Sequence, residues 1–421
     1  MKNSGIEWIG EIPDSWEVNL VKNIFDITRG RVIAKTEIED EPLEDYYPVY
    51  SSQTANSGIL GYIPSYDFAV DSLTWTTDGA KAGTVFLRRG KYSITNVCGI
   101  LTLKSKKYSL DYLNYAVGFS AYNCRRADIN GYKIMSNEMA IIPIVVPYLE
   151  EQQRIAKHLD EKCGKIDELI ANQQGQIEKL KEYKQSVITE AVTKGLDKSA
   201  SLKDSGVEWI SNIPGGWSIQ KVLYQLKMPI TDGPHTTPEL FDSGVAFVSA
   251  EAVSCGNGGI DFNHIRGYIS EEFYQECCLK YIPEIDDVYM IKSGATTGRV
   301  SIVTTLEPKF TIWSPLAVMR TNKNKMLPKF LYYAVQSTHF QRQVALGWSY
   351  GTQQNLGMRT LEQLQLLVPS LVEQHGIVEY LDDNLIKIER LIAIKQEKIE
   401  KLQEYKKSLI YEYVTGKKEV V

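Results

Sequence analysis

Two long segments of the chain carry apolar residues at alternating intervals of four and three positions. One extends from Pro147 to Thr193 and the other from Pro369 to Thr415. The apolar positions are Leu159, Cys163, Ile166, Ile170, Ile177, Leu180, Val187 and Ala191 in the first segment, and Leu381, Leu385, Ile388, Ile392, Ile399, Leu402, Leu409 and Tyr413 in the second. Polar residues interrupt both stripes at matching places, namely Gln173 and Lys184, and Lys395 and Lys406. Heptads sustained over this length predict a long helix in each segment.

Two like helices in one chain can cover each other's apolar stripe, which favours an antiparallel coiled coil. The alternative is a single long helix that lies on a globular core. Each helix should begin just after Pro147 or Pro369, because proline restricts the residue before it and lacks a backbone donor. At ~1.5 Å per residue, about 45 residues would form a rod of roughly 65 Å.

The helical segments belong to a longer internal repeat. Residues 4–13 read SGIEWIGEIP, and residues 205–214 read SGVEWISNIP, 201 positions later. The helical segments match at an offset of 222 positions, so the second copy holds 21 additional residues. If a pseudo-twofold relates the copies, the carboxyl end of the chain must lie beside its amino end, because the first copy makes that connection covalently.

Between the matched segments, residues 17–146 and 218–368 contain short β-rich runs such as GTVFL, GILTL, VAFVSA and RVSIVTT, separated by turn-forming residues. The predicted fold class is therefore α+β. Two mixed α/β domains would be separated by two long antiparallel coiled-coil helices in a circular, pseudo-twofold repeat. The expected boundaries are 1–147 for the first mixed domain, 148–200 for the first helix and linker, 201–369 for the second mixed domain, and 370–421 for the second helix.

Composition is ordinary for a globular protein, with 421 residues, 43% hydrophobic residues and a formal net charge of -5. No apolar run approaches the ~18 residues of a membrane span, and no secretory signal is present, so we expect a cytoplasmic protein that does not contact a membrane. The six cysteines form no C-x-x-C pair and the five histidines no ligand spacing, so neither a metal site nor a disulfide is predicted.

Side chains suited to nucleic acid cluster in both variable segments. Arginine can pair with guanine and Asn or Gln with adenine, whereas Lys, Ser and Thr suit phosphates. The candidates are Arg29, Arg31, Ser51, Ser52, Gln53, Thr76, Thr77, Lys81, Arg88, Arg89, Arg125, Arg126 and Lys133 in the first segment, and His235, Thr236, Thr237, Lys292, Thr296, Thr297, Arg299, Tyr350, Thr352, Gln353, Gln354 and Asn355 in the second. For each of them the alternative is an ordinary solvated loop side chain.

Catalytic motifs are missing from the sequence. It has no G-x-S-x-G, no H-E-x-x-H and no Walker motif, and no reactive side chain recurs with the repeat. The glycines of GAKAG and GATTG favour tight turns between strands over a phosphate cradle. We therefore expect no catalytic residue, although an enzyme with its site in one variable segment stays open. A coiled-coil scaffold without a role on DNA is a further alternative.

Two motifs carry a family resemblance. Each variable segment is preceded by G-x-E-W-I-x-x-I-P-x-x-W, and each helix begins with P-x-L-x-E-Q-x-x-I. Along essentially its whole length the chain resembles the specificity subunit of type I restriction-modification systems. One departure is Val146-Pro147 and Val368-Pro369, where the family usually has two prolines, and it affects only how the chain enters each helix.

The resemblance implies that each variable segment is a target recognition domain for one half of a split site in double-stranded DNA. Two DNA methyltransferase subunits would bind the helices and bring S-adenosylmethionine, and two restriction-translocase subunits would use ATP and Mg²⁺. This chain itself would hold no cofactor and catalyse nothing. Half-sites about one helical turn apart, ~34–36 Å, lie within reach of the predicted rod.

Partner subunits require equivalent surfaces on the two copies, and aromatic residues often anchor interfaces. The partner-binding candidates are Trp8, Trp16, Trp209 and Trp217, with Glu151, Gln152, Glu373 and Gln374 at the helix starts. The alternative for the tryptophans is packing of each domain against its helices, and the sequence does not choose between the two.

Overall fold

The computed structural model describes residues 1–129, 131–207, 210, 212–348 and 354–420. The chain forms two compact units. Unit 1 comprises Met1–Gln174 and Glu397–Val421, and unit 2 comprises Gly175–Gln396. Each unit thus contains one variable segment, one part of the first long helix and one part of the second.

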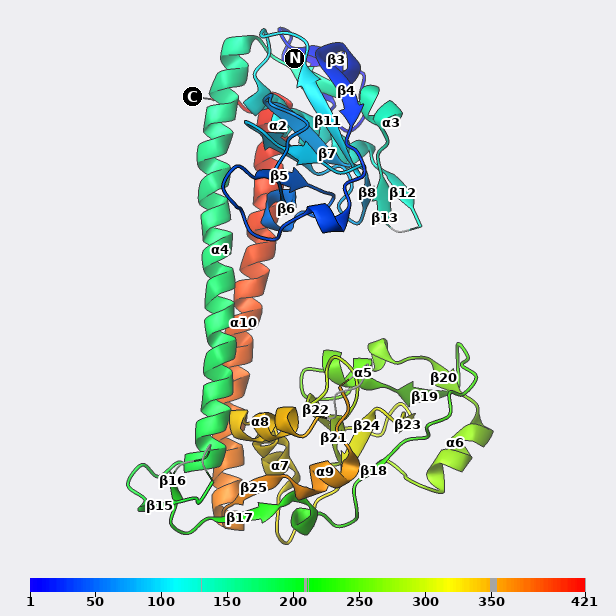
Figure 1. Ribbon diagram of the computed structural model, residues 1–421, viewed down its shortest axis with the longest axis vertical. Helices are drawn as coiled ribbons and strands as arrows, with labels where there is room; N and C mark the ends of the chain where they lie inside the picture. Colours follow the sequence, from blue (N-terminus) through cyan, green and yellow to red (C-terminus); the bar gives the residue numbers. More distant parts are fainter. Residues whose placement is uncertain (130, 208–209, 211, 349–353, 421) are drawn as a thin grey trace. The chain divides into compact units, whose positions relative to one another are not determined.

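The long helices are α4 (Leu149–Lys194) and α10 (Leu371–Val414), so each begins two residues after the predicted proline. They run antiparallel within each unit (Figure 1). In unit 1 the Nζ of Lys406 lies 2.7 Å from both carboxylate oxygens of Asp167. In unit 2 the ion pair of Lys184 with Glu389 repeats this contact at the positions 222 residues away. The antiparallel pairing of the helices is therefore confirmed.

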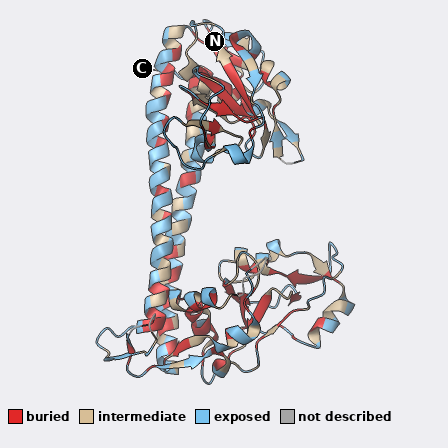
Figure 2. Ribbon diagram, viewed as in Figure 1, coloured by how far each residue is buried: buried red, intermediate tan, exposed pale blue. Residues whose placement is uncertain are grey.

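The predicted apolar stripe is the buried face of each helix (Figure 2). Leu159 and Leu381 are completely covered, and the other heptad positions are buried or half-buried. Burying a leucine side chain contributes about 1.5–3 kcal/mol. The coiled-coil prediction is confirmed, and the helices also form part of both domain cores, because Leu159 belongs to the main core of unit 1 and Leu381 to that of unit 2.

The remainder of unit 1 is a mixed α/β domain. Its elements are β1 (Lys2–Asn3), β2 (Glu11–Ile12), β3 (Glu17–Leu20), α1 (Val21–Ile24), β4 (Phe25–Arg29), η1 (Lys35–Glu37), β5 (Tyr47–Tyr50), η2 (Ala55–Gly58), β6 (Ile59–Ile63), β7 (Ser72–Thr76), β8 (Asp78–Gly79), β9 (Val85–Arg88), β10 (Ser93–Ile94), β11 (Cys98–Leu103), α2 (Leu110–Cys124), β12 (Arg126–Asp128), β13 (Gly131–Lys133), α3 (Ser136–Ala140) and β14 (Pro143–Val146). The central sheet has the order β4-β11-β7-β9, with antiparallel neighbours. Its residues Leu73, Trp75 and Leu101 form the core together with Tyr112 of α2.

Unit 2 repeats this plan. Its elements are β15 (Leu202–Asp204), β16 (Asn212–Pro214), β17 (Ser218–Lys221), η3 (Val222–Gln225), β18 (Thr231–Asp232), β19 (Val245–Val248), α5 (Ala250–Cys255), η4 (Phe262–His264), β20 (Tyr268–Ile269), α6 (Glu271–Cys278), β21 (Val288–Ile291), β22 (Val300–Ile302), β23 (Phe310–Ile312), β24 (Leu316–Met319), α7 (Pro328–Ala334), α8 (Thr338–Leu346), α9 (Met358–Gln363) and β25 (Gln365–Val368). The main sheet has the order β18-β24-β21-β22. Strands β21 and β24 are buried along their whole length, as their unbroken apolar sequences VYMI and LAVM require.

The ends of the two helices pack against the repeated motif in the same way. After α4, Gly195 lies against Trp217, and after α10, Gly416 lies against Pro13 and Trp16. Both glycines have positive φ, +71° and +67°, which other residues adopt only with strain. Lys417 also donates a hydrogen bond to the carbonyl of Glu11, so the two termini meet in unit 1 (Figure 1). The predicted circular repeat is confirmed.

Candidate nucleic-acid interface

In unit 1 the loops that follow four strands meet at one end of the sheets. Arg29 is the last residue of β4, and its Nη2 donates to the carbonyl of Asn96, which lies after β10, at 3.0 Å. The hydroxyl of Thr95 donates to that of Ser51, after β5, at 3.1 Å. The backbone N–H of Thr77, after β7, donates to the carbonyl of Val97 at 3.2 Å. We call this end, formed by the carboxyl ends of β4, β5, β7 and β10, the first edge.

Several predicted candidates lie on the first edge with accessible side chains. Arg29, Gln53 and Lys81 are exposed, and Ser51 and Ser52 are half-buried. In contrast, Thr76 and Thr77 are each only 1% exposed, and their hydroxyls donate to the carbonyls of Lys81 and Val97. The two threonines therefore shape the GAKAG turn, and their prediction as direct contacts is wrong.

The prediction of Arg88 as a DNA contact is also wrong, because only 4% of this residue is exposed. Its Nε donates to the hydroxyl of Thr74 at 3.0 Å and its Nη1 to the carbonyl of Ser57 at 2.7 Å. The guanidinium also lies 3.5 Å from the centre of the Tyr50 ring. Burial lowers the pKa of Arg88. Arg88 is thus part of the domain interior and has no surface to offer to DNA.

Four other basic candidates of unit 1 form ion pairs at the surface. The pairs are Arg31 with Asp67, Arg89 with Asp71 and Asp111, Arg126 with Glu138, and Lys133 with Asp128. Exposed pairs of this kind contribute only about 0–1 kcal/mol, so a phosphate can compete for the cation. Arg125 lies between the rings of Tyr122 and Tyr132, at 3.8 and 3.9 Å from their centres. Strand β13 joins this group to the first edge, because it pairs with β8, where Lys133 lies opposite Asp78 in the antiparallel register.

Unit 2 has an equivalent end, formed by the carboxyl ends of β18, β19, β21 and β23, which we call the second edge. The N–H of Trp313, after β23, donates to the carbonyl of Val248 in β19 at 2.9 Å. Lys292, after β21, donates its N–H to the carbonyl of Pro315 at 2.8 Å, and Gly294 donates to that of Gln354 at 3.0 Å. Segments far apart in the sequence therefore meet at this edge, as they do in unit 1.

Most of the second-segment candidates lie around the second edge. His235, Thr236, Thr237, Arg299, Gln354 and Asn355 are exposed, and Thr296 and Thr297 are half-buried. Lys292 differs from the expectation, because it is buried and its Nζ lies 3.4 Å from Oδ2 of Asp232. Tyr350, Thr352 and Gln353 lie outside the described residues.

Sequence reasoning missed Lys280, which forms an ion pair with Asp232 at the second edge while half of its side chain stays exposed. Lys280 follows α6 and is 48 residues from Asp232. The local signal was Asp232 itself, which stands in the run TDGPHTTP with the candidates His235, Thr236 and Thr237 but was not predicted with them.

Two of the tryptophan partner candidates are covered by the chain itself, whereas the carboxylates that they contact are half-buried (Glu151) and exposed (Glu373). Trp16 and Trp217 are 2% and 1% exposed, and their indoles donate to Glu151 and Glu373 at 2.9 and 2.8 Å. The sequence left open whether these tryptophans pack within the chain or bind a partner. Their burial shows that they pack within the chain, so the two indoles offer no surface to a partner. Trp8 is half-buried and packs edge-on against Phe119. Trp209 lies outside the described residues.

Gln152 and Gln374 are equally buried, at 1% and 0% exposure. The side-chain oxygen of each accepts from a backbone N–H, of Ser109 and Leu327 respectively, at 2.8 Å in both units. Each glutamine thus ties its helix to the loop before α2 or α7. Their prediction as partner contacts is wrong, because they fix the domain on the helix instead.

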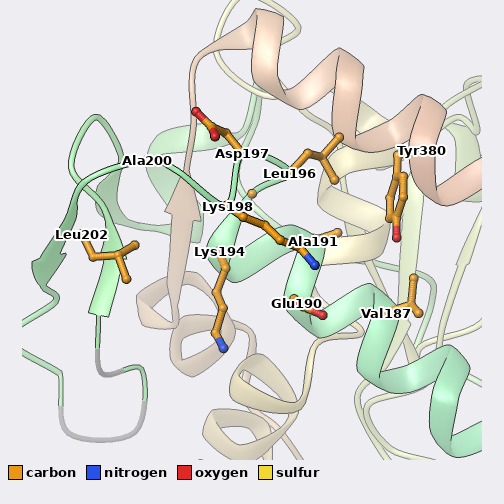
Figure 3. A pocket seen from close by; sticks show the side chains of 11 residues that line it. Val187, Glu190, Ala191, Lys194, Leu196, Asp197, Lys198, Ala200, Leu202 and Tyr380 are labelled. Carbon is orange, nitrogen blue, oxygen red and sulfur yellow. The ribbon is translucent and has the colours of Figure 1, made fainter.

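A cavity of about 480 Å³ lies in unit 2 beside the end of α4, against Tyr380 of α10 (Figure 3). Its rim carries charges of both signs, with Glu190 and Asp197 beside Lys194 and Lys198. This balance gives the cavity no preference for an anion such as DNA, and we place no site there.

Metal and membrane sites were not expected. In the described part of the chain, no group of three or more His, Cys, Asp or Glu side chains is arranged to hold a metal ion. None of the described helices has the length and apolar character that crossing a membrane requires.

Known proteins with similar sequences point to one family. The family model described as the type I restriction modification DNA specificity domain matches residues 13–182 and 240–404. A type I specificity subunit of Mycoplasma pneumoniae is 28% identical over 367 residues, which cover 86% of this chain and 87% of that protein. The specificity subunit of the type I restriction enzyme MjaVIII of Methanocaldococcus jannaschii is 26% identical over 422 residues, covering 96% and 93%.

One solved structure shares the fold. A chain from a study of complex assembly and conformational transition of a type I restriction-modification system superposes with a TM-score of 0.65 and 15% identity, covering 96% of this chain and 99% of that one. The matched family model spans the first variable segment, residues 240–368 of the second, and most of both helices. The chain therefore belongs to the family of type I restriction-modification DNA specificity proteins.

Proposed function

We propose that this chain reads a DNA site in two separate parts, with the first edge on one half-site and the second edge on the other. The observation that carries the proposal is a pair of equivalent strand ends with different side chains. At the first edge β4 ends at Arg29 and is followed by Gly30-Arg31, whereas at the second edge β18 ends at Asp232 and is followed by Gly233-Pro234. Equivalent positions with unlike side chains suit two half-sites of unlike sequence.

The equivalence of the two ends rests on close packing of the glycines. A Cβ on Gly30 would lie 2.2 Å from the carbonyl oxygen of Ile94, and one on Gly233 would lie 1.9 Å from that of Ile312. In both units the chain therefore crosses directly over the end of a neighbouring strand. The residues on either side of each glycine are thereby held at the edge, where Arg29 and Arg31 are exposed and Asp232 is buried.

The repeated frame supports the second part of the proposal, which is that the helices carry two methyltransferase subunits. The solved relative was studied as part of a complex assembly. The ion pairs Lys406–Asp167 and Lys184–Glu389 occur at matching positions in units 1 and 2. Two like surfaces suit two copies of one partner. In this proposal the partners supply S-adenosylmethionine, and restriction subunits supply ATP and Mg²⁺, while this chain carries no catalytic residue.

Footprinting of this chain in complex with its methyltransferase partner tests the proposal. We expect two protected segments separated by a spacer of constant length, because each edge contacts its own half-site. One continuous short footprint, or protection that does not depend on sequence, would contradict it. Because the net charge is -5, we expect the isolated chain to bind DNA weakly.

A further inference from the structure

A buried carboxylate at the second edge is surrounded by basic side chains. Asp232 ends β18 and has no exposed surface. Lys280 forms an ion pair with its Oδ1, while the Nζ of Lys292 lies 3.4 Å and the Nε2 of His235 lies 3.1 Å from its Oδ2. Oδ2 accepts no hydrogen bond from the described residues. A charged carboxylate in this position is stable only because cations compensate it.

The basic side chains differ in their access to solvent. The Lys292 side chain is 11% exposed, whereas those of Lys280 and His235 are 49% and 71% exposed. The positive charge of Lys292 balances the negative charge of Asp232. Lys280 therefore adds a positive charge on the solvent-exposed side of the group. Burial raises the pKa of Asp232, but Lys280, Lys292 and His235 outweigh this effect and hold the pKa below its ordinary value. Asp232 is therefore ionised at neutral pH.

The surroundings fix where the exposed side chains of Lys280 and His235 lie. Gly233 is pressed against Ile312, which sets the course of the chain from Asp232 to His235. A cavity of about 210 Å³ beside the group is lined by Asp232, Thr236 and Lys280, and by the exposed carboxylate of Glu276. Glu276 is the one acidic side chain besides Asp232 on the described lining, and it disfavours a free anion deep in this cavity. The exposed Lys280 ammonium and His235 imidazole at the rim remain suited to a phosphate of a larger ligand.

We propose that Asp232 is a positioning residue that holds Lys280 and His235 as a joint contact to one backbone phosphate of the second half-site. The inference rests on the proposed function and adds the ligand group and the residues. It applies to unit 2 alone, because the corresponding strand end in unit 1 carries the exposed Arg29, which reaches the surface without a buried carboxylate to hold it.

The salt dependence of DNA binding tests the contact with Lys280, using the full chain with its methyltransferase partner and a duplex that contains the footprinted site. Each phosphate contact contributes about -0.9 to the slope of log K against log salt concentration. Lys280→Ala should weaken binding about three- to tenfold at low salt and make the slope about one unit less negative. Lys280→Arg should keep the slope. Lys323→Ala is the matched control, because Lys323 pairs with Asp286 beyond the opposite end of β24 and should change neither quantity.

Asp232→Asn separates positioning from simple attraction. The variant removes a negative charge, so a purely electrostatic role predicts tighter binding, whereas loss of position predicts weaker binding with contacts to the first half-site unchanged. If this variant fails to fold, the Lys280 variants alone decide, since half of that side chain is exposed. An unchanged slope with Lys280→Ala, or tighter binding with a folded Asp232→Asn, would overturn the inference. A wild-type complex that protects no bipartite site would instead overturn the proposed function.

Discussion

The indole Nε1 of Trp16 lies 2.9 Å from Oε2 of Glu151, and Trp217 makes the same bond to Glu373 at 2.8 Å. In both units this bond joins the repeated Trp-containing motif to the first turn of a long helix. The motif is therefore written twice because each domain needs the same attachment to the helical frame. Trp16 and Trp217 face the interior of their own domains.

Replacing Trp16 tests this packing role. Trp16→Phe removes the hydrogen bond to a charged acceptor and part of a buried ring, so it should lower the free energy of unfolding of unit 1 by about 2–4 kcal/mol. Urea titration of the full chain measures the change. Trp8→Phe is the control, since Trp8 is half-buried, and should cost less. Unaltered stability together with lost partner binding would show that Trp16 is a partner anchor after all.

The matching bond in unit 2 predicts a pH effect. Burial raises the pKa of Glu373, but hydrogen bonds from Ser370 and Trp217 outweigh it, so the pKa of the folded protein lies below the ordinary value. The stabilisation is then fully present above about pH 4.5, the ordinary pKa of a glutamate, and is lost as the pH falls through the lower folded-state pKa. The stability difference between wild type and Glu373→Gln should therefore shrink below about pH 4.5. A difference that is constant from pH 7 to pH 3 would be inconsistent with this mechanism.

Leu159 and Leu169 provide a matched pair on one helix. Leu159 is completely buried, and Leu169 is 47% exposed. Leu159→Ala should cost about 2–5 kcal/mol because it leaves a cavity in the core of unit 1, whereas Leu169→Ala should cost about 1 kcal/mol or less. Chemical denaturation compares them. Equal losses would mean that the buried face of α4 is assigned wrongly.

Arg88 and Arg89 are neighbours with opposite roles. Arg88→Met should destabilise unit 1 by about 2–4 kcal/mol, because Thr74 and Ser57 lose a buried donor. Arg89→Ala removes surface ion pairs of a side chain that is 57% exposed, and should cost about 0–1 kcal/mol. Thermal unfolding and DNA binding are measured together. A stable Arg88→Met variant with relaxed specificity for one half-site would restore Arg88 as a base contact.

The helical frame could be predicted from the sequence because its signal is local and repeated. The spacing from Leu159 to Ala191 requires only the period of an α-helix, and the second copy confirms the register. The circular closure also followed from the repeat, since the contact of Gly195 with Trp217 in unit 2 requires a similar contact of Gly416 with Trp16 in unit 1.

The candidate interface was less predictable, because residue type does not reveal burial. Thr76 and Arg88 have the chemistry of DNA contacts, yet the fold places them inside unit 1. Conversely, Lys280 reaches the second edge only through the packing of α6 near Asp232, 48 residues away, and no local pattern encodes that contact. Long-range packing thus decided which polar side chains stay available.

Mapping methylated adenines in DNA from cells that express this chain with its methyltransferase partner tests the central claim most directly. With the wild-type chain, the partner should methylate a site of two short sequences with a spacer of fixed length. Arg29→Ala, which alters an exposed side chain of the first edge, should relax one of these sequences and leave the other sequence and the spacer unchanged. Methylation of a single continuous motif, or a change in both sequences with Arg29→Ala, would contradict the account.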